Sequence, residues 1–390
     1  MSGRDYSATY FLLCGIALLA MFSTSLILPL IPIYAKQIGA TGVVIGFSVA
    51  AYWISRIVME IPSGFVSQRF GYYRSMAVGL GLNVLGTALS AYAVNPIQFV
   101  LARALMGIGA PLFFAVATTF VLNLFDAERR GGAMGIFQGI EFAGTIVGST
   151  FSGYVVSVFD FRLSFLFSAG LILIALILVV VPPHIRSESV RMTASSSLSL
   201  SAMREVFWNR RLLIVSSATF AEFIMSTGIL MTVFPLYASE GLGFSLTSIG
   251  LLMGSRSVGF VVAMFSMGAI SDRVGRKPVL LFGVGATAVL IAVLNFVSSF
   301  VGLVAAFFLL GITTGAIWIV CPVLAAEAVE PHQRGAAIGT YRTFFDLGSI
   351  LGPIVMSAVM EGYGIAPCFY LASALLFANL VPVLRLDEKR

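Results

Sequence analysis

The chain alternates long apolar stretches with short polar connections along its whole length. Stretches of about 20 mostly apolar residues are long enough to cross a bilayer as α-helices. Twelve such stretches are expected, at residues 8–34, 44–64, 74–93, 97–124, 133–157, 163–182, 212–237, 246–269, 279–298, 301–328, 336–360 and 365–384. The pattern therefore predicts an all-α integral membrane protein with twelve transmembrane helices.

Composition supports a polytopic membrane protein over a soluble domain. Hydrophobic residues make up 59% of the chain and charged residues 10%, whereas a soluble domain carries about 25% charged residues. Most Lys and Arg residues fall in the two terminal segments and in alternate connections, and only Lys36 and Arg162 fall on the opposite side. This asymmetry follows the positive-inside rule. It predicts cytoplasmic termini in the plasma membrane and accounts for the net charge without a nucleic-acid partner.

A polar segment recurs after the second apolar stretch of each half. Residues Gly268 to Lys277 read GAISDRVGRK, and residues Gly64 to Arg74, 204 positions earlier, read GFVSQRFGYYR. Charged side chains are costly in hydrocarbon, so we expect both segments to be short basic turns at the cytoplasmic face. Other residues match at the same offset: Gly107 with Gly311, Arg130 with Arg334, Gly144 with Gly348, and Gly148 with Gly352.

The repeat predicts two six-helix bundles, at residues 1–181 and 212–390, joined by a cytoplasmic linker at 182–211. We expect the linker to be a flexible tether; an amphipathic surface helix at 199–209 is the alternative. The first stretch of each half ends alike, with Pro32 and Pro235 before a tyrosine. We expect Pro29 and Pro32 to bend the first span and Pro235 the seventh, for gating or for packing.

The polar segment G-x-x-x-D-R-x-G-R-K/R resembles the signature loop of the major facilitator superfamily of secondary transporters. The later copy matches in full, and the earlier one has Gln68 in place of the acid. The resemblance implies two pseudo-symmetric bundles, a small-molecule substrate bound near the midplane and alternating access. It also implies an ion gradient, most simply of protons, as the energy source in place of a cofactor.

Glycines are frequent in spans five and eleven. Gly135, Gly139, Gly144 and Gly148 have small-xxx-small spacing, which allows close helix approach. The segment 348–353, GSILGP, resembles the glycine-proline motif of drug–proton antiporters, although that branch carries the motif in span five, where this chain has Ser149. Helix packing alone is the competing interpretation of these glycines.

Three carboxylates, Glu141, Glu222 and Asp346, are expected near the midplane of their spans. A carboxylate there stays protonated when isolated and ionises beside a cation or water, which is what proton coupling requires. Arg256 and Arg342 are the candidate partners, and static salt bridges are the competing interpretation.

Arg103 begins a segment that resembles the R-x-x-x-G-x-G motif associated with proton coupling. Arginine keeps its proton, so Arg103 would influence a nearby carboxylate or bind an anion; tying helices through backbone carbonyls is the alternative. Arg56 and Glu60 lie four residues apart and can pair within one helix. The expected gating and cytoplasmic network comprises Arg56, Glu60, Gly64, Arg69, Gly71, Arg130, Gly268, Asp272, Arg273, Gly275, Arg276, Glu327 and Arg334.

Together these features predict a proton-coupled transporter that exports amphipathic or drug-like compounds, and we expect a monomer. The alternatives are proton-linked uptake of a small, possibly anionic metabolite and a non-transporting membrane sensor with the same fold. The sequence has no phosphate-binding loop or metal-ligand cluster, so we expect neither an ATP-driven pump nor an enzyme.

Overall fold

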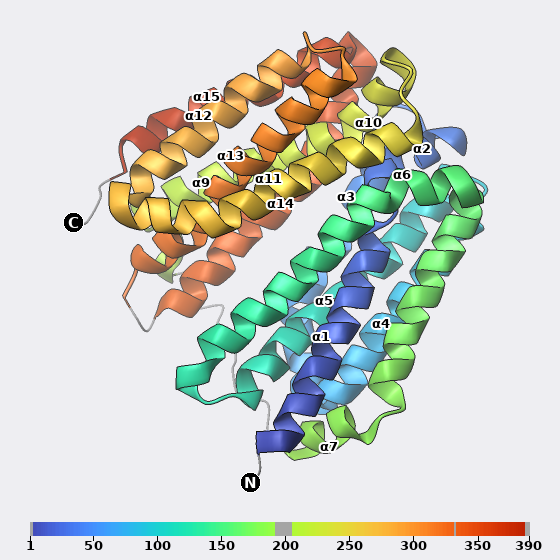
Figure 1. Cartoon of the computed structure of the whole chain (residues 1–390), viewed down its shortest axis with the longest axis vertical. Coiled ribbons are helices and arrows are strands. Elements are labelled where there is room, and N and C mark those ends of the chain that lie inside the picture. The colour runs from blue at the N-terminus through green and yellow to red at the C-terminus, as the bar shows by residue number, and fades with distance from the viewer. Residues whose placement is uncertain (1–2, 192–204, 331–332, 387–390) are drawn as a thin grey trace. The chain divides into compact units, whose positions relative to one another are not determined.

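The structure is a computed structural model, and it describes residues 3–191, 205–330 and 333–386. Helices account for its regular structure over these ranges (Figure 1). The first half contains α1 (Gly3–Ser25), η1 (Leu28–Leu30), α2 (Ile31–Gln37), α3 (Val43–Phe70), α4 (Tyr72–Ala91), α5 (Pro96–Leu124), α6 (Ala127–Val180) and α7 (Pro183–Arg191). The second contains α9 (Arg210–Met225), η2 (Ser226–Val233), α10 (Phe234–Leu236), η3 (Tyr237–Gly241), α11 (Leu246–Val274), α12 (Arg276–Leu294), α13 (Phe300–Glu327), α14 (Arg334–Tyr363) and α15 (Ile365–Leu384).

The predicted all-α membrane fold is confirmed. Ten helical stretches of the described residues are long and apolar enough to cross a membrane. One of them, Arg129–Val180, is two helices divided at Asp160, whose φ of 61° interrupts the helical backbone. The helix α4 falls outside the ten because Arg74 and Asn83 lower its hydropathy. Counting α4 and both parts of the divided stretch gives the expected twelve spans within the part of the chain that the structure describes.

The polar segments expected to be turns are mostly helical, so that expectation is wrong. The helix α3 continues to Phe70 and α11 continues to Val274, because neither segment contains a helix-breaking residue before its second glycine. The chain reverses at Gly71 and Gly275, whose φ values are 85° and 101°. These left-handed conformations favour glycine, which explains why the second glycine is present in both copies.

The first span of each half departs from a regular α-helix, and the predicted bending by its prolines stays a prediction. In the first half α1 ends at Ser25, and η1 and α2 follow it, with Pro29 in η1. In the second half α9 passes into η2, an eight-residue π-helix, with Pro235 in the short α10 that follows. The i→i+5 backbone pattern appears in the bond from the Phe234 N–H to the Ile229 carbonyl at the end of η2.

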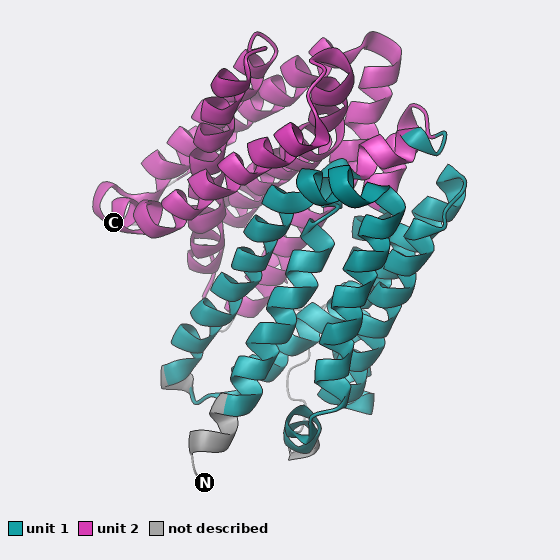
Figure 2. Ribbon diagram, turned by 45° about the vertical axis from the view of Figure 1, so that its right-hand side comes forward, with its two compact units in different colours: residues 1–30, 37–39, 51–197 teal, residues 31–36, 40–50, 198–390 magenta. Residues whose placement is uncertain are grey.

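Contacts between Cα atoms divide the chain into two units (Figure 2). Unit 1 comprises residues 1–30, 37–39 and 51–197, and unit 2 comprises residues 31–36, 40–50 and 198–390. By contact, α2 and the first turns of α3 therefore group with unit 2. The bundle boundaries expected from the sequence remain a prediction.

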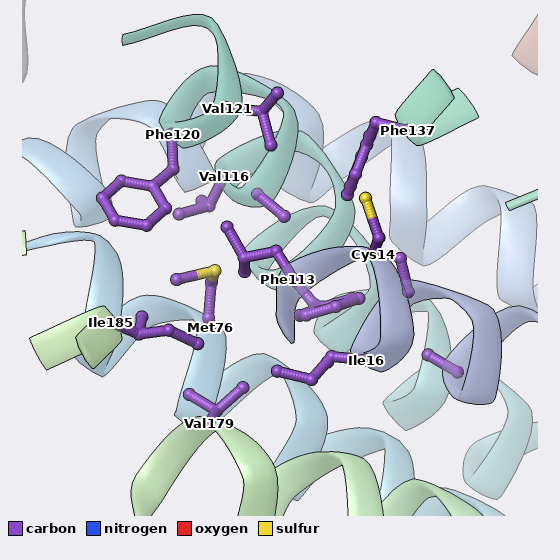
Figure 3. Close-up of a cluster of buried hydrophobic side chains, with 14 of the residues drawn as sticks. Cys14, Ile16, Met76, Phe113, Val116, Phe120, Val121, Phe137, Val179 and Ile185 are labelled. Atoms are coloured by element: carbon purple, nitrogen blue, oxygen red, sulfur yellow. The ribbon is translucent and has the colours of Figure 1, made fainter. Parts of the chain in front are cut away.

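The core of unit 1 gathers apolar side chains from α1, α4, α5, α6 and α7. Figure 3 shows Ile16, Met76, Phe113 and Val179 lying together with Ile185 of α7. The helix α7 was not expected, because its residues 183–191 were assigned to a flexible linker. It is held on α4 by a 3.0 Å bond from the Tyr73 N–H to the Ser189 hydroxyl. Most of the alternative surface helix, residues 199–204 of 199–209, lies outside the described residues.

Glycines bring helices together at matching places in the two halves. A Cβ added at Gly144 or Gly148 would lie 2.7 or 2.4 Å from a backbone oxygen of α1. A Cβ added at Gly348 or Gly352 would lie 2.6 Å from a backbone oxygen of α9. The sequence repeat therefore corresponds to equivalent close packing of α6 on α1 and of α14 on α9.

The same expectation is wrong for Gly135 and Gly139. An added Cβ would meet no atom within 4 Å at either position among the described residues. Neither glycine therefore faces a closely packed helix, and their spacing does not reflect tight packing.

Candidate functional site

Glu222 and Arg256 form a charged pair inside unit 2. Glu222 lies in the last turn of α9 and is only 5% exposed. It interacts electrostatically with Arg256 of α11. Burying either charge alone costs several kcal/mol, and each charge compensates part of the other's cost. The structure thus brings together two residues that the sequence indicated separately.

The π-helix η2 begins beside this pair. Arg256 donates a 3.2 Å hydrogen bond from Nη2 to the hydroxyl of Ser226, the first residue of η2. Within the described residues, the buried Nε of Arg256 has no hydrogen-bond partner. Short π-helical segments are rare and occur frequently at functional sites. Here the segment places a hydroxyl opposite the guanidinium.

Three further polar side chains surround Glu222. Tyr341 of α14 and Cys321 of α13 both interact electrostatically with Glu222, and both hydrogen-bond to Thr219, one turn before it in α9. Cys321, Thr219 and Tyr341 are buried. We call Thr219, Glu222, Ser226, Arg256, Cys321 and Tyr341 the polar cluster. No sequence signal points to its uncharged members, because they meet only through packing of α9, α11, α13 and α14.

An aromatic cluster adjoins the polar cluster through consecutive residues of α9. The centre of the Phe223 ring lies 3.9 Å from that of Phe345 and 5.8 Å from that of Trp318. The centre of the Trp318 ring lies 6.4 Å from that of Phe260 and 5.9 Å from that of Phe345. All four rings are partly exposed, so the cluster presents aromatic surface next to a buried carboxylate.

Asp346 and Arg342 have different environments although one helical turn separates them. Asp346 is 2% exposed and follows Phe345 of the aromatic cluster. Arg342 is exposed, and it interacts electrostatically with Tyr341. Of the two expected cationic partners, Arg256 is the one that the structure places against Glu222.

Arg103 is the buried cation of unit 1. It is 2% exposed, its guanidinium lies 5.3 Å from the centre of the Tyr52 ring, and Nη1 lies 3.8 Å from the sulfur of Met106. A cation over an aromatic face is stabilised by the ring quadrupole. Arg103 is therefore held between α3 and α5 through an aromatic contact.

Three other charged residues of unit 1 lie in α3 and α6: Arg56, Glu60 and Glu141. Arg56 lies 3.8 Å from Glu60 on the next turn of α3, and its guanidinium lies 5.2 Å from the Trp53 ring. Glu141 is partly buried in α6 and interacts electrostatically with Cys14 of α1. In the first signature segment, Gly64 and Arg69 are exposed.

The second signature segment forms an ion-pair network in unit 2. Arg276 pairs with Glu327 of α13 and lies 4.0 Å from Asp272. Arg273 and Arg334 are exposed nearby and line a common pocket with these residues. In unit 1, the counterpart of Arg334 is Arg130, which donates a 2.9 Å bond from Nε to the Phe125 carbonyl. No group of His, Cys, Asp and Glu among the described residues is arranged to hold a metal ion.

Both halves of the chain match one known protein family. The family model described as Major Facilitator Superfamily matches residues 13–227 and again residues 218–390. The chain belongs to the major facilitator superfamily. It is therefore a multi-pass membrane transporter and not an enzyme, and the resemblance drawn from the signature segments is confirmed.

Relatives and solved structures place the chain among diverse members of the superfamily. It is 24% identical over 370 residues to multidrug resistance protein MdtG of Proteus mirabilis, covering 92% of this chain and 90% of that protein. It is 25% identical to multidrug resistance protein 2 of Bacillus subtilis, over 99% and 97% of the two chains. A crystal structure of a variant of the nucleoside transporter NupG has a TM-score of 0.81 at 16% identity, covering 97% and 100%. The structural likeness concerns the fold alone.

Proposed function

We propose that this superfamily member is a proton-coupled exporter of amphipathic organic compounds, located in the plasma membrane with both termini in the cytoplasm. The observation that carries the proposal is the pairing of the buried Glu222 with the part-buried Arg256. Ionisable groups inside a membrane protein are expensive, and they mark ion and substrate pathways. The names of the two multidrug resistance relatives support the substrate class and the direction.

The pair supplies the chemistry that coupling needs. When Glu222 is ionised, Arg256 compensates its charge. When Glu222 takes up a proton, the guanidinium keeps its hydrogen bond to the Ser226 hydroxyl. Protonation therefore changes the charge of the polar cluster by one unit. A change of that kind gives the two protonation states different preferences for conformation and ligand.

The aromatic cluster supplies the contact surface for a substrate. Aromatic rings bind flat apolar groups by stacking and bind organic cations through their faces. Because Glu222 and Phe223 are consecutive, a compound on the rings lies close to the carboxylate that carries the proton. Competition between proton and compound for this region is the basis of exchange transport.

Uptake of an anionic metabolite is the second candidate. It is supported by the buried guanidinium group of Arg103 and the part-buried one of Arg256, since arginine binds carboxylates and phosphates through paired hydrogen bonds. In that case Glu222 would still carry the proton, and the substrate would contact Arg256 in place of the rings.

Proton movement in proteoliposomes tests the proposal. The vesicles hold an inside-acid pH gradient, and an enclosed dye reports pH while lipophilic cations, weak acids, amino acids and nucleosides are added in turn. We expect lipophilic cations or other amphipathic compounds to dissipate the gradient, and Phe223→Ala to reduce the effect. Dissipation by weak acids at a rate equal to that of protein-free vesicles, with no response to any other class, would contradict coupled transport.

A further inference from the structure

A basic pocket lies at the signature-segment end of unit 2 and shares no lining residue with the polar cluster. Its volume is about 650 Å³, within the range of about 300–1,000 Å³ typical of small-molecule sites. It lies where α11 ends and α12 begins, at the face that the charge pattern predicts to be cytoplasmic. Its charged lining comprises Arg211, Asp272, Arg273, Arg276, Glu327 and Arg334.

Positive charge is in excess in the lining of this pocket. Both acids are directed to Arg276, which pairs with Glu327 and lies 4.0 Å from Asp272. Among the described residues, Arg211, Arg273 and Arg334 form no ion pair. Three arginines around one concavity repel each other, and an anion bound between them removes that repulsion.

Backbone geometry adds to the positive potential. Arg211 lies in the first turn of α9, Arg276 begins α12 and Arg334 begins α14, so three helix N-termini meet the pocket. The helices α12 and α14 have no side-chain cap at Gly275 and Gln333. Helix N-termini present free N–H groups and a partial positive charge, which suits anions.

The C-terminal end of α13 also lies at this pocket, and its free carbonyl groups would repel an anion. Side chains already bond to part of this end. The amide Nδ2 of Asn209 donates a 2.9 Å bond to the Ala328 carbonyl and so covers that end. Glu327, the last residue of α13, is occupied by Arg276.

We propose that this pocket binds a phosphate group, held by Arg211, Arg273 and Arg334 and by the first turns of α12 and α14. Arginine forms paired, charge-assisted hydrogen bonds with phosphate oxygens, and three such side chains match a group carrying several acceptors. The phosphate belongs either to the headgroup of an anionic lipid or to a soluble phosphate ester. The site goes beyond transport, since it lies outside the polar and aromatic clusters.

Thermal unfolding of the purified full chain tests this site at constant ionic strength. The probes are short-chain phosphatidylglycerol, diacylglycerol with the same chains, and glycerol phosphate. We expect phosphatidylglycerol or glycerol phosphate to raise the unfolding temperature and diacylglycerol to have no effect. Stabilisation by phosphatidylglycerol alone identifies a lipid headgroup, and stabilisation by glycerol phosphate identifies a soluble ester; both outcomes support the phosphate site.

Two variants make the test specific. Arg334→Gln should weaken phosphate binding about tenfold, the value expected for loss of one charge-assisted hydrogen bond. Arg210→Gln is the matched control, because Arg210 is exposed and adjacent to Arg211 but does not line the pocket. It should bind as the unaltered chain does. No stabilisation by either phosphate probe, or equal weakening in both variants, would overturn the proposal.

Discussion

At the scale of residues, the pair of Glu222 and Arg256 has an asymmetric energetic role. Without Arg256 the buried Glu222 must either take up a proton or keep its charge without compensation, and the cost of this rises with pH. Arg256→Met should therefore lower the unfolding temperature more at alkaline than at acidic pH. The double variant Glu222→Gln, Arg256→Met should recover much of that loss, because it leaves no buried charge. Thermal unfolding in detergent measures both, and equal destabilisation of the single and double variants would show that the two side chains are not energetically coupled.

The exposed pair of Lys36 and Glu240 provides a contrast. It has a 2.6 Å contact, but the two side chains are 47% and 49% exposed. Solvent screens such pairs, and each contributes only about 0–1 kcal/mol. Lys36→Met should therefore change the unfolding temperature little. A loss comparable to that of Arg256→Met would mean that the Lys36 contact is held much more tightly than its exposure indicates.

Only the charged residues of the candidate site could be predicted from the sequence. Glu222 and Arg256 could be recognised from sequence, because charges inside apolar stretches are conspicuous. Tyr341, Cys321 and Thr219 could not, since nothing in their local sequence distinguishes them from core residues. Their association depends on the packing of helices that are far apart in the chain.

At the scale of elements, close helix contacts should make some glycines irreplaceable. A Cβ at Gly352 would lie 2.6 Å from the Ile224 carbonyl oxygen, which cannot move without shifting the helix. Overpacking of this kind costs about 1–3 kcal/mol, so Gly352→Ala should lower the unfolding temperature.

Gly139→Ala is the matched control for that substitution. An added Cβ meets no described atom within 4 Å there, and alanine is favoured over glycine in a helix by about 1 kcal/mol. The unfolding temperature of Gly139→Ala should be unchanged or higher. If Gly352→Ala and Gly139→Ala behave alike, close approach of α14 to α9 does not explain the glycine repeat.

The apolar pattern located the spans well but not their ends or their helical type. Signature segments continue as helix because charged residues at a membrane face are compatible with helical backbone, and only Gly71 and Gly275 stop it. The π-helix η2 has no counterpart in side-chain periodicity over so few residues. The helix α7 was missed because its polar, arginine-containing sequence resembles a linker, although Ile185 and Ser189 attach it to unit 1.

At the scale of the whole molecule, the two halves share a scaffold and differ in charge. Gly144 and Gly148 pack in unit 1 as Gly348 and Gly352 do in unit 2. The position 204 residues before Asp346 is Phe142, and the position 204 residues before Arg256 is Tyr52. Charges needed only for the fold should have followed the repeat. Their failure to follow it supports a role in proton coupling.

If Glu222 couples proton movement to transport, its replacement must affect two kinds of flux differently. Proteoliposomes hold the unaltered protein or Glu222→Gln, with a labelled compound found to move protons. One assay follows exchange at equal concentrations on both sides, and the other follows accumulation driven by a pH difference. We expect Glu222→Gln to retain exchange and to lose pH-driven accumulation. Accumulation by Glu222→Gln at the rate of the unaltered protein would contradict it.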